Sequence, residues 1–184
     1  GLWFDLRGAS QHEYIFPLER WHELAVTRDV RVGECVLGVE VSPDSSTVAF
    51  VAAGQTLRGV HLVAHSVGKS FEVTPAVDLI RWFVDKYDPA AVLLDRDAPG
   101  AVMVAQLLQA GIEPVLLNGG QVSLAFRELR QGVVDGVVSH DGSDLWESQL
   151  QQAVERKSKD GKYPAIDRFS GDVSELVAAT FAAW

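Results

Sequence analysis

The sequence predicts an α/β protein in which one mixed sheet carries helices on both faces. Three runs rich in β-branched residues, at 35–41, 47–53 and 60–67, follow one another with turn residues between them, which is typical of an antiparallel meander. Beyond residue 74, segments with helical spacing alternate with short apolar runs, a pattern that indicates parallel strands joined by helical crossovers. At 184 residues, of which 47% are hydrophobic, the chain has material for one substantial core.

The first expected helix follows the meander directly. Thr74 is expected to cap it, Pro75 suits its first position, and Pro89 limits its end. The elements after it are expected, in order, to be a strand at 91–94, a helix at 99–110, a strand at 113–117 and a helix at 122–133.

Two helices are expected to end the chain, each opened by a capping box. Asp144 with Glu147 marks one that runs to about residue 157, and Asp172 with Glu175 marks the other. The apolar residues of the last helix have helical spacing, which indicates an amphipathic helix with one face on the core. They are Val173, Leu176, Val177, Thr180, Phe181 and Trp184.

Residues 1–34 show no sustained period and are expected to form a linker packed on the edge of a domain that spans 35–184. The chain opens on Gly1 and its only methionine is Met103, so we expect a larger portion to precede it. It contains no apolar run of about 18 residues, which argues against a membrane span. Cys35, the single cysteine, cannot form an internal disulfide and is expected to be a buried thiol in a reducing cytoplasm.

The formal net charge of −9 argues against a protein that holds nucleic acid through a diffuse basic surface. It is compatible with a metal-dependent enzyme, because clustered carboxylates count as excess negative charge until cations bind. Phosphodiester hydrolysis can be driven by two cations about 3.5–4 Å apart, and hard cations prefer oxygen ligands. Acidic residues inside apolar elements are therefore the candidates for a metal site.

Three acidic residues fit this description. Glu40 interrupts the otherwise apolar run at 36–41, and the alternative interpretation is an edge strand with Glu40 in solvent. Asp95 follows the apolar strand at 91–94, where open α/β sheets place ligands, although turn formation explains it equally well. Asp172 opens the last helix and is either a ligand or only its cap.

Other residues extend this candidate site. Asp97 lies two residues after Asp95, on the same side of an extended chain, and is a reserve metal ligand. His140 is expected to be a structural hydrogen-bonding residue, while His61 with His65 lacks a third ligand for zinc. Four basic residues are expected to contact phosphates beside the metal site, the alternative being a solvated loop. They are Lys157, Lys159, Lys162 and Arg168.

The ordered set of short motifs resembles the nuclease domain of phage terminase large subunits, the motors that package and cut viral DNA. The resemblance begins at residue 17 and reaches residue 180. It rests on PLERW at 17–21, LGVEVSPD at 37–44, LLD at 93–95, HDG at 140–142 and GDVSELVAAT at 171–180.

This resemblance implies a ribonuclease H-like fold and an endonuclease that uses two Mg²⁺ or Mn²⁺ ions to cut concatemeric double-stranded DNA. Carried over position by position, the family's three acidic ligands fall on Glu40, Asp95 and Asp172. The implied partners are DNA, an upstream ATPase domain, the portal and the small terminase subunit, in the cytoplasm of a bacterial host. The family usually has aspartate at the first position. The extra methylene of Glu40 is therefore expected to lower activity, shift it toward Mn²⁺ or abolish it, since catalytic geometry tolerates errors of only about 0.5 Å.

Two other functions stay open at this level. A Holliday-junction resolvase of the same fold would act as a dimer on branched DNA. A non-catalytic docking or regulatory module of a packaging motor would explain the altered first ligand. The endonuclease hypothesis requires that Glu40, Asp95 and Asp172 meet in space.

Overall fold

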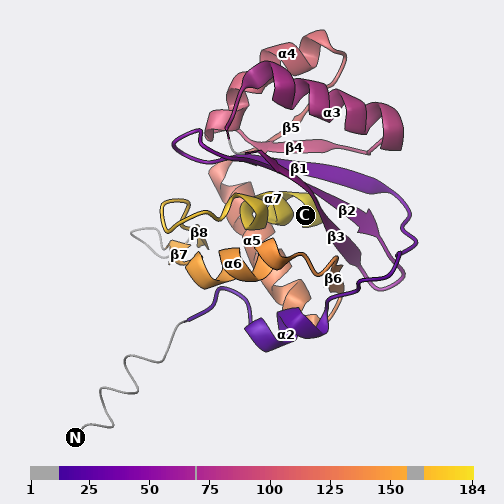
Figure 1. The fold of residues 1–184 in the computed structure, drawn as a ribbon, viewed down its shortest axis with the longest axis vertical. Coiled ribbons are helices and arrows are strands. Elements are labelled where there is room, and N and C mark those ends of the chain that lie inside the picture. Colours follow the sequence, from indigo (N-terminus) through magenta and orange to yellow (C-terminus); the bar gives the residue numbers. More distant parts are fainter. Residues whose placement is uncertain (1–12, 69, 157–163) are drawn as a thin grey trace, which may run out of the picture.

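A computed structural model describes residues 13–68, 70–156 and 164–184 of the chain. Its centre is a six-stranded mixed sheet with the strand order β5-β4-β1-β2-β3-β6 (Figure 1). The three central strands are antiparallel, whereas β4 pairs parallel with β1, β5 with β4, and β6 with β3. The strands are β1 (Cys35–Val41), β2 (Val48–Gln55), β3 (Val60–Gly68), β4 (Val92–Asp95), β5 (Val115–Leu117) and β6 (Val138–His140).

Helices cover both faces of the sheet (Figure 1). One face carries the long helix α3, the 3-10 turn η1 and the helix α4, and the other carries α2, α5, α6 and α7. The first group is α3 (Val73–Tyr87), η1 (Pro99–Met103) and α4 (Val104–Gln109). The second is α2 (Leu18–Glu23), α5 (Gly119–Asp135), α6 (Asp144–Gln152) and α7 (Ser174–Ala183).

The alternation of side chains along β1 separates these two layers. Leu37 and Val39 belong to the apolar core under α3, so Gly38 and Glu40 face the opposite layer, which contains α7. A Cβ at Gly38 would overlap the carbonyl oxygen of Ala178, and the missing side chain therefore lets α7 lie directly against the strand. The helix that follows Asp172 is thus held against the strand that carries Glu40.

The predicted α/β class and the meander are confirmed, and the short helices and strands after it are found with shifted ends. Thr74 does not cap α3, which begins at Val73 with Glu72 at its N-cap and no side-chain capping bond among the described residues. The helix expected at 99–110 begins as a 3-10 turn. The helix expected to reach about residue 157 ends at Gln152.

Three short strands were not predicted. β6 pairs with β3, and the two-residue strands β7 (Glu155–Arg156) and β8 (Ala165–Ile166) pair antiparallel with each other. Strands as short as β6, β7 and β8 show no alternating pattern in sequence, and the partner of β6 lies far along the chain.

Both predicted capping boxes are wrong. Ser143, and not Asp144, caps α6 through its hydroxyl, which accepts a hydrogen bond from the backbone N–H of Leu145 at 3.4 Å. The N-cap position of α7 is Val173, so Asp172 does not cap that helix. The apolar residues predicted to face the core from α7 are buried, except Trp184. The prediction of a single core face is wrong, because the helix is buried on all sides between the sheet, α5 and α6.

The segment before β1 contributes to the main core. Phe16 and Trp21 are buried with the residues of α5 and α6, and Ala25 forms a β-bridge with His140. Residues 1–12 lie outside the described ranges, so the division at residue 34 stays a prediction. Cys35 is only partly buried, and this burial raises the pKa of its thiol. No helix in the described ranges is both long and apolar enough to cross a bilayer.

Candidate active site

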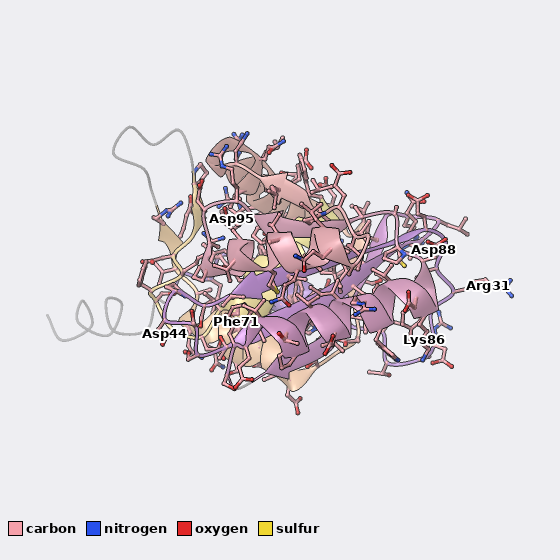
Figure 2. All side chains as sticks on the ribbon, turned by 90° about the horizontal axis from the view of Figure 1, so that it is seen from above. Arg31, Asp44, Phe71, Lys86, Asp88 and Asp95 are labelled. Carbon is pink, nitrogen blue, oxygen red and sulfur yellow. The ribbon has the colours of Figure 1, made fainter. Side chains whose placement is uncertain are left out.

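Glu40 and Asp95 come from neighbouring strands that end at the same edge of the sheet. β1 and β4 run parallel with Gly38 opposite Leu93, and continuing this register brings Glu40 level with Asp95. Side chains alternate between the two faces along a strand, and Glu40 and Asp95 lie two residues after Gly38 and Leu93, which face α7. The side chains of both acids are therefore directed to the α7 side of the sheet. Figure 2 shows Asp95 and Asp44 toward the same end of the molecule, opposite to Arg31. Two of the three predicted ligands are therefore brought together.

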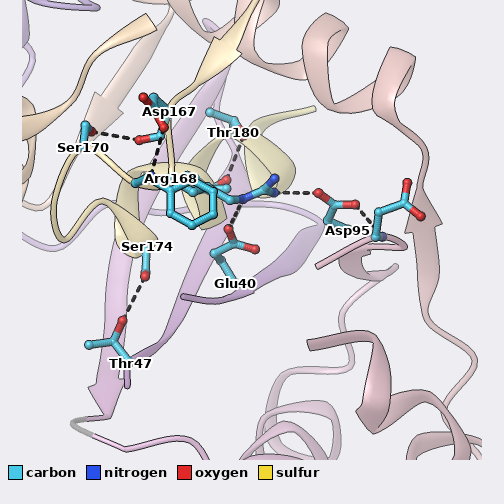
Figure 3. A network of polar contacts seen from close by, with 11 residues as sticks. Glu40, Thr47, Asp95, Asp167, Arg168, Ser170, Ser174 and Thr180 are labelled. Atoms are coloured by element: carbon cyan, nitrogen blue, oxygen red, sulfur yellow. Dashed lines mark hydrogen bonds and ion pairs between the residues drawn. The ribbon is translucent and has the colours of Figure 1, made fainter. Parts of the chain in front are cut away.

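A single arginine bridges the two carboxylates (Figure 3). Arg168 donates from Nε to Oε2 of Glu40, and from Nη2 to Oδ2 of Asp95 at 2.6 Å. The site is almost closed to solvent, since Glu40 is 1% exposed, Asp95 6% and the Arg168 side chain 16%. The edge-strand alternative for Glu40 is therefore wrong, and this acid is a buried charge with a partner.

A tight turn after β8 presents Arg168 to these acids. The carboxylate of Asp167 accepts the backbone N–H of Phe169 at 2.9 Å, and the carbonyl of Asp167 accepts the hydroxyl of Ser170 at 2.8 Å. The backbone N–H of Asp167 donates to the carbonyl of Val154 at 2.7 Å, which ties the turn to the end of α6. The backbone at Arg168 is thus fixed locally, and only its side chain reaches the site.

Burial dominates the electrostatics of this cluster. Loss of water raises the pKa of Glu40 to about 7, with Arg168 opposing the rise and Asp95 adding to it. Burial alone would lower the pKa of Arg168, but the two carboxylates outweigh it and raise that pKa. With both acids ionised, two negative charges face one positive charge, so the cluster keeps a formal charge of −1 and favours a further cation.

The oxygens of the pair differ in their hydrogen-bond partners. Oε1 of Glu40 is buried and has no hydrogen-bond partner among the residues that the structure describes. Oδ1 of Asp95 accepts the backbone N–H of Asp97 at 2.8 Å, so Asp95 also forms the turn that its sequence context suggests. Buried carboxylate oxygens at strand ends are suitable donors for Mg²⁺ or Mn²⁺, and a buried oxygen without a partner is costly unless one is supplied.

Asp172 lies near this pair without joining it. Its side chain is exposed, and its backbone N–H donates to Oε1 of Gln152 at 3.2 Å. It lines the same cavity as Arg168, with a volume of about 480 Å³ and with Asp44 and Thr47 among the other lining residues. Over the described residues, no group of three or more His, Cys, Asp or Glu side chains is close enough to hold a metal ion. The third predicted ligand thus lies outside the Glu40 and Asp95 pair, on a neighbouring cavity that shares Arg168 with it.

The reserve ligand and the basic residues have other surroundings. The Asp97 side chain is exposed and contacts Arg96 at 3.4 Å. Lys157, Lys159 and Lys162 lie outside the described residues. The pairing of Arg168 with two acids was missed by the sequence interpretation. Its only sequence signal is that Arg168 is the one basic residue after position 162.

The cavity that holds Arg168 and Asp172 is bordered by hydroxyl groups and one aromatic ring. Ser42, Ser46 and Thr47 line one side, and Phe169 lines the other with 83% of its surface exposed. Asp44 is fixed in the turn after β1, where hydrogen bonds from Ser46 and Ser42 lower its pKa to about 2. Asp44 is thus a solvated turn residue.

The histidines and a third buried acid are outside the pair. His140 is buried, stacks on Trp21 with the ring centroids 4.1 Å apart, and contacts the Trp21 carbonyl at 2.7 Å through Nε2. This confirms its structural role, and burial lowers its pKa. His61 contacts the hydroxyl of Ser139 at 2.8 Å, and the side chain of His65 lies outside the described part of the chain. Glu175 is fully buried in α7, and neither carboxylate oxygen has a hydrogen-bond partner among the described residues.

Comparison with known proteins agrees with the fold. No family model matches the sequence, and no curated protein matches it. The large terminase of bacteriophage HK97 superposes with a TM-score of 0.73 at 14% identity, covering 93% of this chain and 43% of that one. The large terminase nuclease of thermophilic phage G20c, solved with bound magnesium, superposes with a TM-score of 0.72 at 12% identity, covering 94% of this chain and 97% of that one. The same nuclease with bound cobalt gives a TM-score of 0.72.

These similarities establish the fold. The chain has the ribonuclease H-like fold of the nuclease domains of phage large terminases, as the sequence resemblance implied. It spans less than half the length of the HK97 terminase chain and almost the whole of the separate G20c nuclease.

Proposed function

We propose that this chain is the metal-dependent DNA endonuclease domain of a phage packaging terminase. The observation that carries the proposal is the burial of Glu40 and Asp95 side by side at the carboxyl ends of two parallel strands, with one Glu40 oxygen lacking a partner among the described residues. The shared fold supports it, because the G20c terminase nuclease was solved with bound magnesium.

Glu40, Asp95 and Asp172 are the proposed metal ligands. Bound Mg²⁺ or Mn²⁺ ions would supply Lewis acidity toward the phosphodiester and would activate water. The burial of Glu40 and Asp95 fixes their carboxylates and excludes bulk water, while Asp172 would supply a third carboxylate from the neighbouring cavity. The loop from Arg168 to Asp172 connects these positions, so its rearrangement is what would close Asp172 onto the pair.

DNA recognition is proposed to use the cavity at this end of the molecule. Arg168 and Phe169 offer a cation and a stacking surface there. The serine and threonine hydroxyls, which bond to Asp44 and Ser174 in this structure, would turn to phosphate oxygens when DNA binds. The net charge of −9 leaves little long-range attraction for DNA. We therefore propose that an upstream ATPase domain, together with Lys157, Lys159 and Lys162, supplies much of the grip, and that the portal and small subunit complete the packaging assembly.

The test is plasmid nicking with Mg²⁺ and Mn²⁺ added separately. Glu40→Gln and Asp95→Asn should lower nicking at least about a hundredfold, since even second-shell partners of metal ligands contribute about 10- to 100-fold. Glu128→Gln, which removes the same charge from an exposed site on α5, should behave as the parent chain.

The length of the first ligand gives a second comparison in the same assay. Glu40→Asp should raise the activity with Mg²⁺ relative to Mn²⁺, because the shorter side chain restores the residue usual in the family. A parent chain that nicks with neither metal, and an aspartate variant that is equally inactive, would reject the endonuclease proposal.

One observation favours the non-catalytic alternative. Arg168 already neutralises part of the charge of the Glu40 and Asp95 pair, as a purely structural ion pair in a docking module would. In that case, Glu40→Gln and Asp95→Asn would change stability and leave metal binding undetectable in all forms of the protein.

A further inference from the structure

The contacts of Arg168 use the oxygens that a bridging cation needs. Of the four carboxylate oxygens of Glu40 and Asp95, Arg168 contacts one on each residue and the Asp97 backbone N–H contacts a third. Only Oε1 of Glu40 has no partner among the described residues. A divalent cation shared by both acids would lie against the guanidinium, and two positive charges at that separation repel strongly in a buried site.

The hydrogen bonds that hold the turn at Arg168 do not involve its guanidinium. The Asp167 turn fixes the backbone, whereas the long Arg168 side chain borders the cavity of about 480 Å³. Its neighbour Phe169 is almost fully exposed on the same cavity. Rotation about the single bonds of the Arg168 side chain would carry the guanidinium from the acids toward the cavity.

A phosphodiester is the partner best suited to hold the guanidinium there. The planar fork of an arginine pairs with phosphate as it does with carboxylate, through two parallel N–H donors. The cavity also carries the hydroxyls of Ser46 and Thr47, which bond to Asp44 and Ser174 in this structure and would turn to a phosphate oxygen when one is present.

We infer that Arg168 is an internal counter-cation that excludes divalent metal from Glu40 and Asp95 until a DNA phosphate takes over its guanidinium. This inference rests on the proposed function and adds a regulation to it, because metal loading becomes conditional on DNA. By linkage, DNA raises the affinity for metal by the same factor by which metal raises the affinity for DNA.

The experiment measures Mn²⁺ binding by electron paramagnetic resonance, with and without a short DNA duplex whose linkages are phosphorothioates. In the parent chain, the duplex should tighten Mn²⁺ binding about tenfold, within the usual range of coupling between sites. Arg168→Gln should bind Mn²⁺ about tenfold more tightly than the parent without DNA, and the duplex should add little further. Arg130→Gln removes a guanidinium from the partly exposed pair with Glu155 and should match the parent.

Loss of the buried cation also has a measurable effect on folding. Arg168→Gln leaves two buried acids without their partner, so its thermal unfolding is recorded in EDTA and in Mn²⁺. We expect Mn²⁺ to raise the melting temperature of this variant far more than that of the parent. If the variant is unfolded in EDTA, we expect Mn²⁺ to restore its fold. A variant that binds Mn²⁺ no more tightly than the parent, or that stays unfolded with Mn²⁺, overturns the inference.

The outcomes separate this inference from the proposed function. In one outcome, no form of the protein nicks DNA, Arg168→Gln gains Mn²⁺ affinity, and the double variant with Glu40→Gln loses that gain. The counter-cation role then stands and the endonuclease proposal fails. If nicking depends on Glu40 and Asp95 but Arg168→Gln shows no gain in Mn²⁺ affinity, the endonuclease stands and the counter-cation role is rejected.

Discussion

Glu175 gives the clearest test of the energetics of this fold. The side chain is fully buried in α7, and neither of its oxygens meets a hydrogen-bond donor among the described residues. Burial raises the pKa of Glu175 from 4.5 to about 7, and the negative charges of Asp141 and Asp172 add to the rise. The folded protein therefore binds this proton more tightly than the unfolded chain does.

The sign and size of the pH effect follow from this shift. Below about pH 4.5 the carboxyl is protonated in both states, so its titration does not affect stability. As the pH rises from there through the folded pKa of about 7, the carboxyl ionises at a lower pH in the unfolded chain than in the folded protein. This favours the unfolded state, so the free energy of unfolding falls. Each pKa unit corresponds to about 1.4 kcal/mol, so the total loss is about 3 kcal/mol.

The variant Glu175→Gln removes this titration and should become more stable relative to the parent as the pH rises. The difference in the free energy of unfolding between variant and parent should grow by about 3 kcal/mol between pH 4.5 and pH 8. Urea unfolding in the presence of EDTA measures it, and the Glu128→Gln variant controls for the lost charge. The buried amide adds an offset that does not depend on pH, so the slope is the diagnostic quantity. A difference that stays constant over this range would refute the account of Glu175 as an unpaired buried acid.

Two further predictions concern the layers and the cavity. Gly38→Ala should lower the free energy of unfolding by about 1–3 kcal/mol or more, because the new Cβ overlaps the α7 backbone at Ala178. An unchanged midpoint of urea unfolding would contradict the close approach of α7 to β1. Phe169→Ala should weaken the binding of single-stranded or locally opened DNA by about 1–3 kcal/mol, because one stacking platform is lost, while its melting temperature stays that of the parent. Fluorescence anisotropy measures the binding, and equal affinities of variant and parent would remove Phe169 from the proposed DNA site.

The pairing of Arg168 with Glu40 and Asp95 changes how a glutamate at the proposed first metal ligand is understood. The longer Glu40 side chain places one oxygen on the guanidinium and leaves the other without a partner among the described residues. The extra methylene is therefore accommodated in this fold. Its effect on the reaction stays a prediction, which the Glu40→Asp comparison tests.

The sequence by itself determined the antiparallel meander and singled out Glu40 and Asp95 as unusual acids. The meander could be predicted because alternation and turn residues are local signals, and Glu40 stood out because a charge in an apolar strand requires a partner. The motif order was also sufficient to indicate the terminase nuclease fold, which the structural comparison confirms.

Only the tertiary structure decided which partner each acid has. Arg168 is 128 residues from Glu40 and 73 from Asp95, and nothing local distinguishes it from a solvated loop residue. Asp172 and Glu175 have the spacing of a capping box, yet neither caps α7, because packing between the sheet and two helices set the start of that helix and buried Glu175. Propensity and capping are worth about 1 kcal/mol, whereas burial of a helix on all sides involves many times that energy, so long-range packing overrode the local signals at the site itself.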